Sequence, residues 1–292
     1  MKSFILLFLF YSINSYAIEF TWFGTTNIVI RTPESTLMFD PFITHPNLIA
    51  SILFKKVDSD EKLVRKWALE ANLKKVDSVF ISHSHYDHIL DLGSVMKIYK
   101  AKMYGSESAV NFALGQGASR EVVNQVKINK DFELLNMKVL PVEVAHSEHF
   151  LGHVFMKGQI DSPLKLPANM WKIKDGKNLI YHLKFPDKKI LFHPAGRKSP
   201  FFEDYKKLKA EILFIGVAKR ISTLDQLEKI ILPVNPKIII PLHFDNFLSD
   251  LTKNPDHLPG INLDEWEKTI KSKLPGVRII RPKVAQWINI SE

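Results

Sequence analysis

The six residues 83–88, His-Ser-His-Tyr-Asp-His, constrain this chain more than any other stretch. They bring three imidazoles and one carboxylate together directly after the apolar run 79–81. In an extended or turning segment His83 and His85 point the same way, while Asp87 and His88 can turn toward a second position beside the first. Neutral imidazole and carboxylate are ligands that divalent zinc, manganese or iron accept. The stretch therefore predicts a metal site at the end of a strand.

The first 17 residues predict a secretory signal peptide. Lys2 supplies a short positive region, residues 4–11 an apolar core, and residues 15–17 (Ser-Tyr-Ala) a small-x-small cleavage site. The apolar run is far shorter than the roughly 20 residues that span a bilayer. We therefore expect cleavage after Ala17, export to the periplasm or the medium, and no transmembrane segment in the mature chain.

The composition predicts a soluble globular protein, because 46% of the 292 residues are hydrophobic and 24% are charged. The chain has no cysteine, which excludes a disulfide framework and removes thiolate from the candidate ligands and nucleophiles. Without the leader, 39 basic residues face 31 acidic ones, a net charge of +8. This balance favours anionic partners. The lysines are dispersed, however, which makes a nucleic-acid surface unlikely and a solvated surface the better interpretation.

Apolar patterning predicts strands and helices in two similar halves. In the first half we expect strands at 18–23, 27–31, 36–39, 76–81, 102–104, 122–128 and 137–144, and helices at 61–73, 92–99 and 107–115. In the second half we expect strands at 170–173, 179–185, 189–192, 211–216, 237–241 and 277–280, and helices at 201–209, 224–231 and 264–273. This order predicts two mixed sheets packed face to face with helices outside, forming one domain over residues 18–292. The segment 161–169 is expected to be a loop beside the site.

Three later histidines share the context of the first cluster, because each follows an apolar strand. His146 comes after the strand that ends at residue 144, His193 after residues 190–192, and His243 after residues 238–242. Candidate ligands therefore arrive from several strand ends.

With these residues the chain resembles the metallo-β-lactamase superfamily over nearly all of its predicted mature length. The resemblance is carried by Phe39-Asp40-Pro41, residues 82–88, Ala145-His146-Ser147 and Pro241-Leu242-His243-Phe244-Asp245. The last two elements are most similar to the lactonase and phospholipase D-like branches. The resemblance implies an α/β (α+β) fold, a four-layer αββα sandwich of two mixed β-sheets with a metal centre at one edge.

By the same resemblance, two sets of side chains would hold divalent metal, with zinc expected and manganese or iron as alternatives. The first set would be His83, His85 and His146, and the second Asp87, His88 and His243. Family members also place an aspartate after a strand in the second half, where it bridges two metals. Here the corresponding stretch 192–196 reads Phe-His-Pro-Ala-Gly, without a carboxylate. Without this carboxylate two close dications would lack an anionic ligand, so the site could hold either one ion or two.

Two residues are candidates to replace the missing bridge. His193 and Asp245 both follow strands expected near the site, and either could contact metal. Asp245 could equally orient the ring of His243 through a hydrogen bond, as ligating imidazoles commonly require. Asp40 matches a family position that hydrogen-bonds near the ligands, although a strand-ending turn is the alternative interpretation.

Other side chains have weaker claims on the site. His149 and His153 lie close to His146 in sequence, but such histidines are more often surface or packed residues than ligands. His45 could line the pocket. Four aromatic residues could form an apolar wall for a substrate, although core packing is their commoner role: Trp171, Phe201, Phe202 and Phe247.

These observations predict hydrolysis of an ester, lactone or phosphodiester bond by a metal-activated water. A covalent route has no support, since the chain lacks cysteine and a Gly-x-Ser-x-Gly turn. Asp87 is the expected catalytic residue that orients the water, and His193 or His149 could protonate the leaving group. The charge favours a small-molecule or lipid-like, anionic substrate. The rival hypothesis is a metal-binding but inactive descendant of the fold, motivated by the missing aspartate, and a nuclease is a minor alternative.

Overall fold

The computed structural model describes residues 17–46, 56–146, 154–217 and 222–291. Within these ranges it contains two seven-stranded sheets and a two-stranded one. The first sheet has the order β16 (Ile288–Asn289), β1 (Glu19–Trp22), β2 (Ile28–Arg31), β3 (Thr36–Phe39), β5 (Ser78–Phe80), β6 (Lys102–Gly105) and β7 (Val123–Gln125). The second has the order β15 (Arg278–Ile279), β14 (Ile238–Leu242), β13 (Ile212–Gly216), β12 (Lys189–His193), β11 (Asn178–Lys184), β9 (Met137–Val144) and β8 (Phe132–Leu134). The short sheet pairs β4 (Lys56–Val57) with β10 (Ala168–Asn169).

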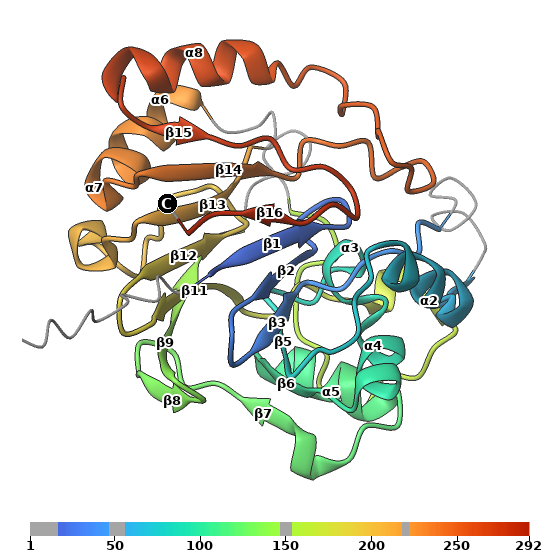
Figure 1. Cartoon of the computed structure of the whole chain (residues 1–292). Helices are drawn as coiled ribbons and strands as arrows, with labels where there is room; N and C mark the ends of the chain where they lie inside the picture. The colour runs from blue at the N-terminus through green and yellow to red at the C-terminus, as the bar shows by residue number, and fades with distance from the viewer. Residues whose placement is uncertain (1–16, 47–55, 147–153, 218–221, 292) are drawn as a thin grey trace, which may run out of the picture.

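Both large sheets begin as antiparallel meanders and continue as parallel strands. The meander β1-β2-β3 is followed by the parallel run β3-β5-β6-β7. The meander β8-β9-β11-β12 is likewise followed by the parallel run β12-β13-β14-β15. Parallel neighbours need a crossover connection, which is where the helices enter. The C-terminal strand β16 returns to pair with β1 in the first sheet (Figure 1).

The two large sheets pack face to face and their aromatic side chains form the core between them. Phe39 on β3 lies 4.5 Å from Phe192 on β12 between ring centroids, and Phe20 on β1 lies 5.2 Å from Phe214 on β13. The Tyr181 hydroxyl donates to the carbonyl of Ile81 at 2.7 Å, which satisfies a buried polar group across the same interface.

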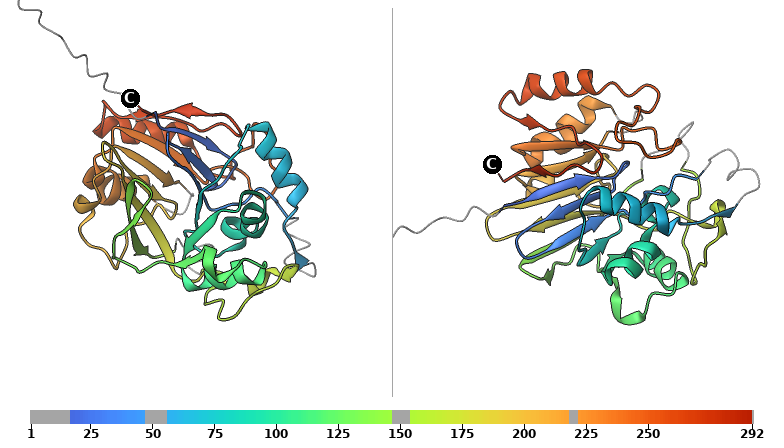
Figure 2. Two further views of the ribbon diagram at one scale, coloured as in Figure 1. Left: turned by 60° about the horizontal axis from the view of Figure 1, so that its bottom comes forward. Right: turned by 45° about the vertical axis from the view of Figure 1, so that its right-hand side comes forward.

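The helices lie on the two outer faces (Figures 1 and 2). Those beside the first sheet are α2 (Glu61–Glu70), α3 (Tyr86–Ile89), α4 (Leu92–Tyr99) and α5 (Glu107–Gly115). Those beside the second sheet are α6 (Thr223–Gln226), α7 (Leu232–Val234) and α8 (Leu263–Lys273), with a π-helical turn at Leu227–Ile231 between α6 and α7. The predicted αββα sandwich is thus confirmed. Among the described helices none has the length and apolar character needed to cross a membrane.

Two predicted elements are wrong. Residues 170–173, predicted as a strand, form a 3₁₀ helix at Met170–Lys172, because the Asn169 side chain accepts from the Trp171 amide at 2.9 Å and caps the turn. The predicted helix at 201–209 shrinks to a 3₁₀ helix at Tyr205–Leu208. The apolar residues of the predicted helix pack from a loop and do not form a continuous helical face.

Gly216 at the end of β13 is predicted to tolerate no side chain. A Cβ there would overlap the carbonyl oxygen of Pro194, a backbone atom that cannot swing away. We expect Gly216→Ala to lower the free energy of unfolding by about 3 kcal/mol, the upper range for overpacking. Gly276→Ala is the matched control, since no atom of the described part of the chain lies within 4 Å of its Cβ position. Urea unfolding followed by circular dichroism measures both, and equal stabilities of the two variants would contradict the expectation.

Candidate metal centre

The segment after β5 delivers four polar side chains to one place because its backbone changes conformation midway. His85 has extended dihedrals and forms the N-cap of α3. The helical turn that follows contains Asp87 and His88, which turns them away from the extended pair and toward a second position. All four side chains are buried.

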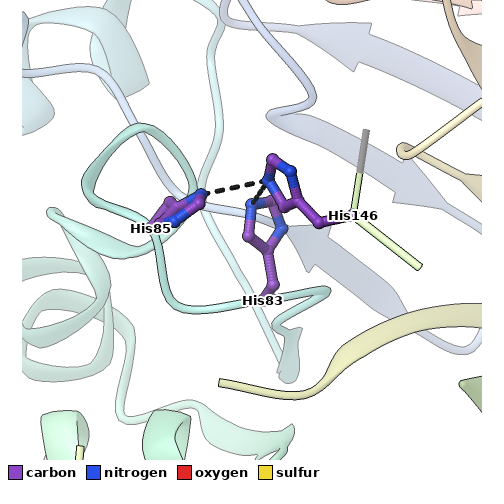
Figure 3. A group of neighbouring side chains, drawn as sticks. All are labelled: His83, His85 and His146. Carbon is purple, nitrogen blue, oxygen red and sulfur yellow. Dashed lines mark hydrogen bonds between the residues drawn. The ribbon is translucent and has the colours of Figure 1, made fainter. Parts of the chain in front are cut away.

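The first group consists of His83, His85 and His146, the last of which comes just after β9 (Figure 3). The Nε2 atom of His146 lies 3.1 Å from Nε2 of His83 and 3.0 Å from Nδ1 of His85. Three ring nitrogens thus converge on one point from two separate segments of the chain.

The second group consists of Asp87, His88 and His243, which follows β14. Oδ2 of Asp87 lies 3.6 Å from Nε2 of His88 and 3.5 Å from Nε2 of His243. The rings of His83 and His88 are 3.9 Å apart between centroids, so the two groups are direct neighbours.

Hydrogen bonds on the far side of two rings fix which nitrogen faces each group. Nε2 of His85 lies 3.0 Å from the carbonyl oxygen of Phe155, to which it can only donate, and this leaves the Nδ1 lone pair toward the first group. Nδ1 of His88 lies 2.9 Å from Oδ2 of Asp40, which leaves Nε2 toward the second group. Such partners are how proteins set the tautomer of a ligating imidazole.

Asp40, directly after β3, is the anchor behind the histidine segment. Its Oδ1 accepts from the Ser82 amide at 2.7 Å and its Oδ2 from the Ser82 hydroxyl at 2.6 Å. The same Oδ2 bonds His88. One fully buried carboxylate therefore holds both the start of the segment and one of its rings.

Burial and neighbouring charges set the protonation of the site. The pKa of His83 is lowered well below its usual value, first by desolvation and then by the surrounding imidazoles. Burial alone would raise the pKa of Asp87, but His88 and His243 outweigh it and hold that pKa well below its usual range. Burial would lower the pKa of His88, whereas Asp87 and Asp40 together raise it. At neutral pH His83 is therefore neutral and Asp87 ionised, the forms that ligate cations.

The donor set fits a divalent ion. Tetrahedral zinc with bonds of about 2.0–2.1 Å to nitrogen has ligand atoms about 3.3 Å apart, close to the separations within the first group. Without a cation, converging lone pairs of buried imidazoles would repel one another. Imidazole and carboxylate suit zinc, and also manganese or iron.

His193 and Asp245 are not brought into either group. His193 is fully buried, accepts from the Gly196 amide through Nδ1 at 3.1 Å, and bonds the Tyr205 hydroxyl through Nε2 at 3.0 Å. Both its nitrogens are used away from the ligand cluster. Asp245 is also fully buried, and its two oxygens accept from the Thr25 amide at 2.9 and 3.0 Å. The bonds of Asp245 go to the Thr25 backbone and not to the His243 ring, whose Nδ1 has no hydrogen-bond partner among the described residues. Neither residue lies in place of the missing bridge.

The remaining candidates divide by position. His149 and His153 lie outside the described residues. Phe247 packs its ring 5.1 Å from that of His243, and Phe202 packs against Tyr205. Trp171 and Phe201 are exposed. Of the four aromatics, only Phe247 has a ring contact with a ligand candidate among the described residues.

Sequence reasoning missed two contributors to the site. The Phe155 carbonyl holds His85, and a backbone oxygen has no signature in a sequence. The Thr26 hydroxyl lies 2.8 Å from Nδ1 of His88 and donates to Oδ2 of Asp40 at 2.8 Å. Its signal was the pair of threonines in the turn between the first two predicted strands.

Comparison with known proteins finds similar sequences and a similar fold. A sequence profile of the metallo-beta-lactamase superfamily matches residues 20–162. A UPF0173 metal-dependent hydrolase from Thermodesulfovibrio yellowstonii is 25% identical over 98% of both chains, and one from Ignicoccus hospitalis is 24% identical over 91% of this chain and 95% of its own. The solved structure of Igni18, a metallo hydrolase from Ignicoccus hospitalis, shares the fold with a TM-score of 0.62, at 14% identity over 94% of this chain and 98% of its own.

In sequence and in fold the chain is thus similar to the metallo-β-lactamase superfamily. It is a metal-dependent hydrolase, similar to the UPF0173 proteins.

Proposed function

We propose that this hydrolase cleaves an ester, lactone or phosphodiester bond in a small or lipid-like, anionic substrate. The observation that carries the proposal is the convergence of three imidazole nitrogens in the first group, at 3.0 and 3.1 Å. His83, His85 and His146 would hold one divalent ion, by expectation zinc. The second group would hold another, with Asp87 as its single carboxylate.

A bound dication would supply hydroxide near neutral pH and polarise the oxygen under attack. The chain's own groups do the positioning. Asp87 stays ionised because its pKa is held low, so it can accept a hydrogen bond from the attacking water and orient it. Phe155 and Asp40 keep the rings of His85 and His88 in the tautomers that face inward. His193 is an unsuitable proton donor, since its pKa is lowered to about 4 by burial.

The number of ions follows from charge. Two neighbouring dications carry four positive charges, whereas the two groups together supply one carboxylate. We therefore expect tight binding at the first group and weaker binding at the second. The net charge of +8 without the leader supports an anionic substrate, because it raises the local concentration of anions.

The decisive experiment measures metal content and hydrolysis together. Protein purified without chelator is analysed for metal, stripped, and reloaded with zinc, manganese or iron before assay on a panel of p-nitrophenyl esters, lactones and bis-(p-nitrophenyl) phosphate. We expect turnover only with metal present. Bound metal without turnover on any member of the panel would instead support the inactive binding protein.

We also propose that the protein is exported, on the basis of the leader at residues 1–17. These residues lie almost wholly outside the described ranges, so the sequence alone supports this step. Fractionation of cells and N-terminal sequencing should find the chain beginning at Ile18 outside the cytoplasm. A cytoplasmic chain that retains Met1 would contradict export.

A further inference from the structure

The turn between β1 and β2, residues 23–27, contacts both of the loops that carry the histidines of the second group. It is closed by two backbone hydrogen bonds of 2.9 Å between Phe23, Gly24 and Asn27. Gly24 has φ +90° and Thr25 has φ +44°, so the chain reverses through the left-handed region. The carbonyl of Thr25 also accepts from the Trp22 ring nitrogen at 3.0 Å.

On one side the turn is bonded to the loop after β14. The His243 amide donates to the carbonyl of Thr25 at 2.9 Å. The Thr25 amide in turn donates to both oxygens of the Asp245 carboxylate. Phe244, between the two loop residues, stacks on Trp22 with ring centroids 5.0 Å apart.

These bonds act on a strained backbone. His243 has φ +60°, a conformation that costs a non-glycine residue about 1–2 kcal/mol. In this conformation of the loop, Nε2 of His243 lies 3.5 Å from Oδ2 of Asp87. The contacts with Thr25 offset the strain and thereby fix where Nε2 of His243 lies.

On its other side the same turn contacts Asp40 after β3 and the histidine segment after β5. The Thr26 hydroxyl donates to Asp40 and lies 2.8 Å from Nδ1 of His88, so it fixes the orientation of the His88 imidazole. Adjacent residues of one turn thus contact two ligand candidates that lie 155 positions apart in sequence.

We propose that the β1–β2 turn, with Asp245, is the positioning device for the second group. It sets the separation of His88 and His243, and therefore the affinity for a second ion, although Thr25, Thr26 and Asp245 touch no metal. This inference rests on the proposed function, since it needs an ion at that group. Asp245 acts through Thr25, because both its oxygens are occupied by the Thr25 amide.

Thr26 allows a sharp test because its two roles can be separated. Thr26→Val keeps the shape and removes the hydroxyl, whereas Thr26→Ser keeps the hydroxyl. Calorimetric titration of the metal-free full chain with Zn²⁺ should give two binding steps for the wild type. We expect Thr26→Val to weaken only the second step by about 10-fold, and Thr26→Ser to restore it.

Asp245→Asn tests the contact between the turn and the loop after β14. The amide retains one acceptor oxygen and should weaken the second step by about 10- to 100-fold, without altering the first. Asp91→Asn is the matched control, since Asp91 is a fully buried carboxylate that also accepts from two backbone amides, those of Ile43 and Thr44. It should destabilise the fold and leave both binding steps unchanged.

Visible absorption spectra of the same variants loaded with Co²⁺ give a second measurement, which a general loss of stability would not change. The visible bands of the first equivalent should be unchanged, and those of the second should shift in Thr26→Val and Asp245→Asn. An unchanged second step in both variants would overturn the positioning role while leaving the hydrolase intact. A wild type that binds a single equivalent would overturn it as well. Hydrolysis without any metal would instead overturn the proposed function.

Discussion

Replacing His85 with alanine is expected to lower turnover of an activated ester by about 10³-fold or more. His85 supplies one of three convergent nitrogens, and its Nδ1 lies 3.0 Å from Nε2 of His146 in the first group. With two protein nitrogens left, an ion would be held weakly, and water would lose the fall in pKa to about 7 that a bound dication provides. The measurement is kcat and metal content on the same preparation.

His182→Gln is the matched control for this variant. His182 is also a buried histidine, 1% exposed, but it lies on β11 with its Nε2 bonded to the carbonyl of Lys209 and belongs to neither group. The control should retain both metal and turnover. If His85→Ala kept its activity with its circular dichroism unchanged, the first group would not be the catalytic centre.

The αββα architecture was predictable because nearly all of its strands and long helices carry local apolar patterns. Residues 36–39, 92–99, 107–115 and 137–144 were predicted with the bounds that the structure has. Two of the four edge strands of the large sheets, β8 and β16, were missed, because both are short and only partly buried and show no clear alternation.

The ligand cluster could be anticipated because each candidate histidine follows an apolar strand, and β5 of the first sheet and β9 and β14 of the second end close together in the sandwich. The same expectation fails for His193. His193 is the last residue of β12, and the residue before it, Phe192, packs against Phe39 in the core between the sheets. Because side chains alternate along a strand, the His193 side chain points to the opposite face. There His193 bonds Tyr205, twelve residues further on. Counting the alternation along β12 would have found this, since the apolar neighbour already defined the inner face.

The role of Asp245 could not be predicted for a different reason. Its partner is a backbone amide 220 positions away, and only the tertiary fold brings Thr25 to it. A carboxylate two residues after a candidate ligand suggested either metal coordination or a hydrogen bond to the His243 ring, and backbone binding was not anticipated. The choice depends on the left-handed turn at Gly24 and Thr25, which places a free amide in front of the carboxylate.

His182 and His193 predict a loss of stability in mild acid. Burial lowers the pKa of each to about 4, against an ordinary value of 6.5. Between these values the unfolded chain binds one more proton per histidine than the folded chain, so the free energy of unfolding falls as the pH falls. Each histidine should cost up to about 1.4 kcal/mol per pH unit, or about 3 kcal/mol over the whole interval.

The two buried rings explain why protonation is resisted. Nδ1 of the buried His182 has no hydrogen-bond partner among the described residues, and Nδ1 of His193 already accepts from the Gly196 amide. A second proton on Nδ1 of His182 would be buried without an acceptor, and one on Nδ1 of His193 would face the N–H of Gly196.

Urea unfolding of the wild type and of His182→Gln between pH 7.5 and pH 5 isolates one of these histidines. Other titrating groups, including the ligand candidates, are common to both proteins and cancel in the difference. At pH 7.5 the wild type should be the more stable protein, because it keeps its packing and its bond to Lys209. By pH 5 its advantage should have fallen by about 2 kcal/mol, since only the wild type has this histidine to protonate on unfolding. A difference that stays constant with pH would mean that His182 titrates alike in the folded and unfolded chains.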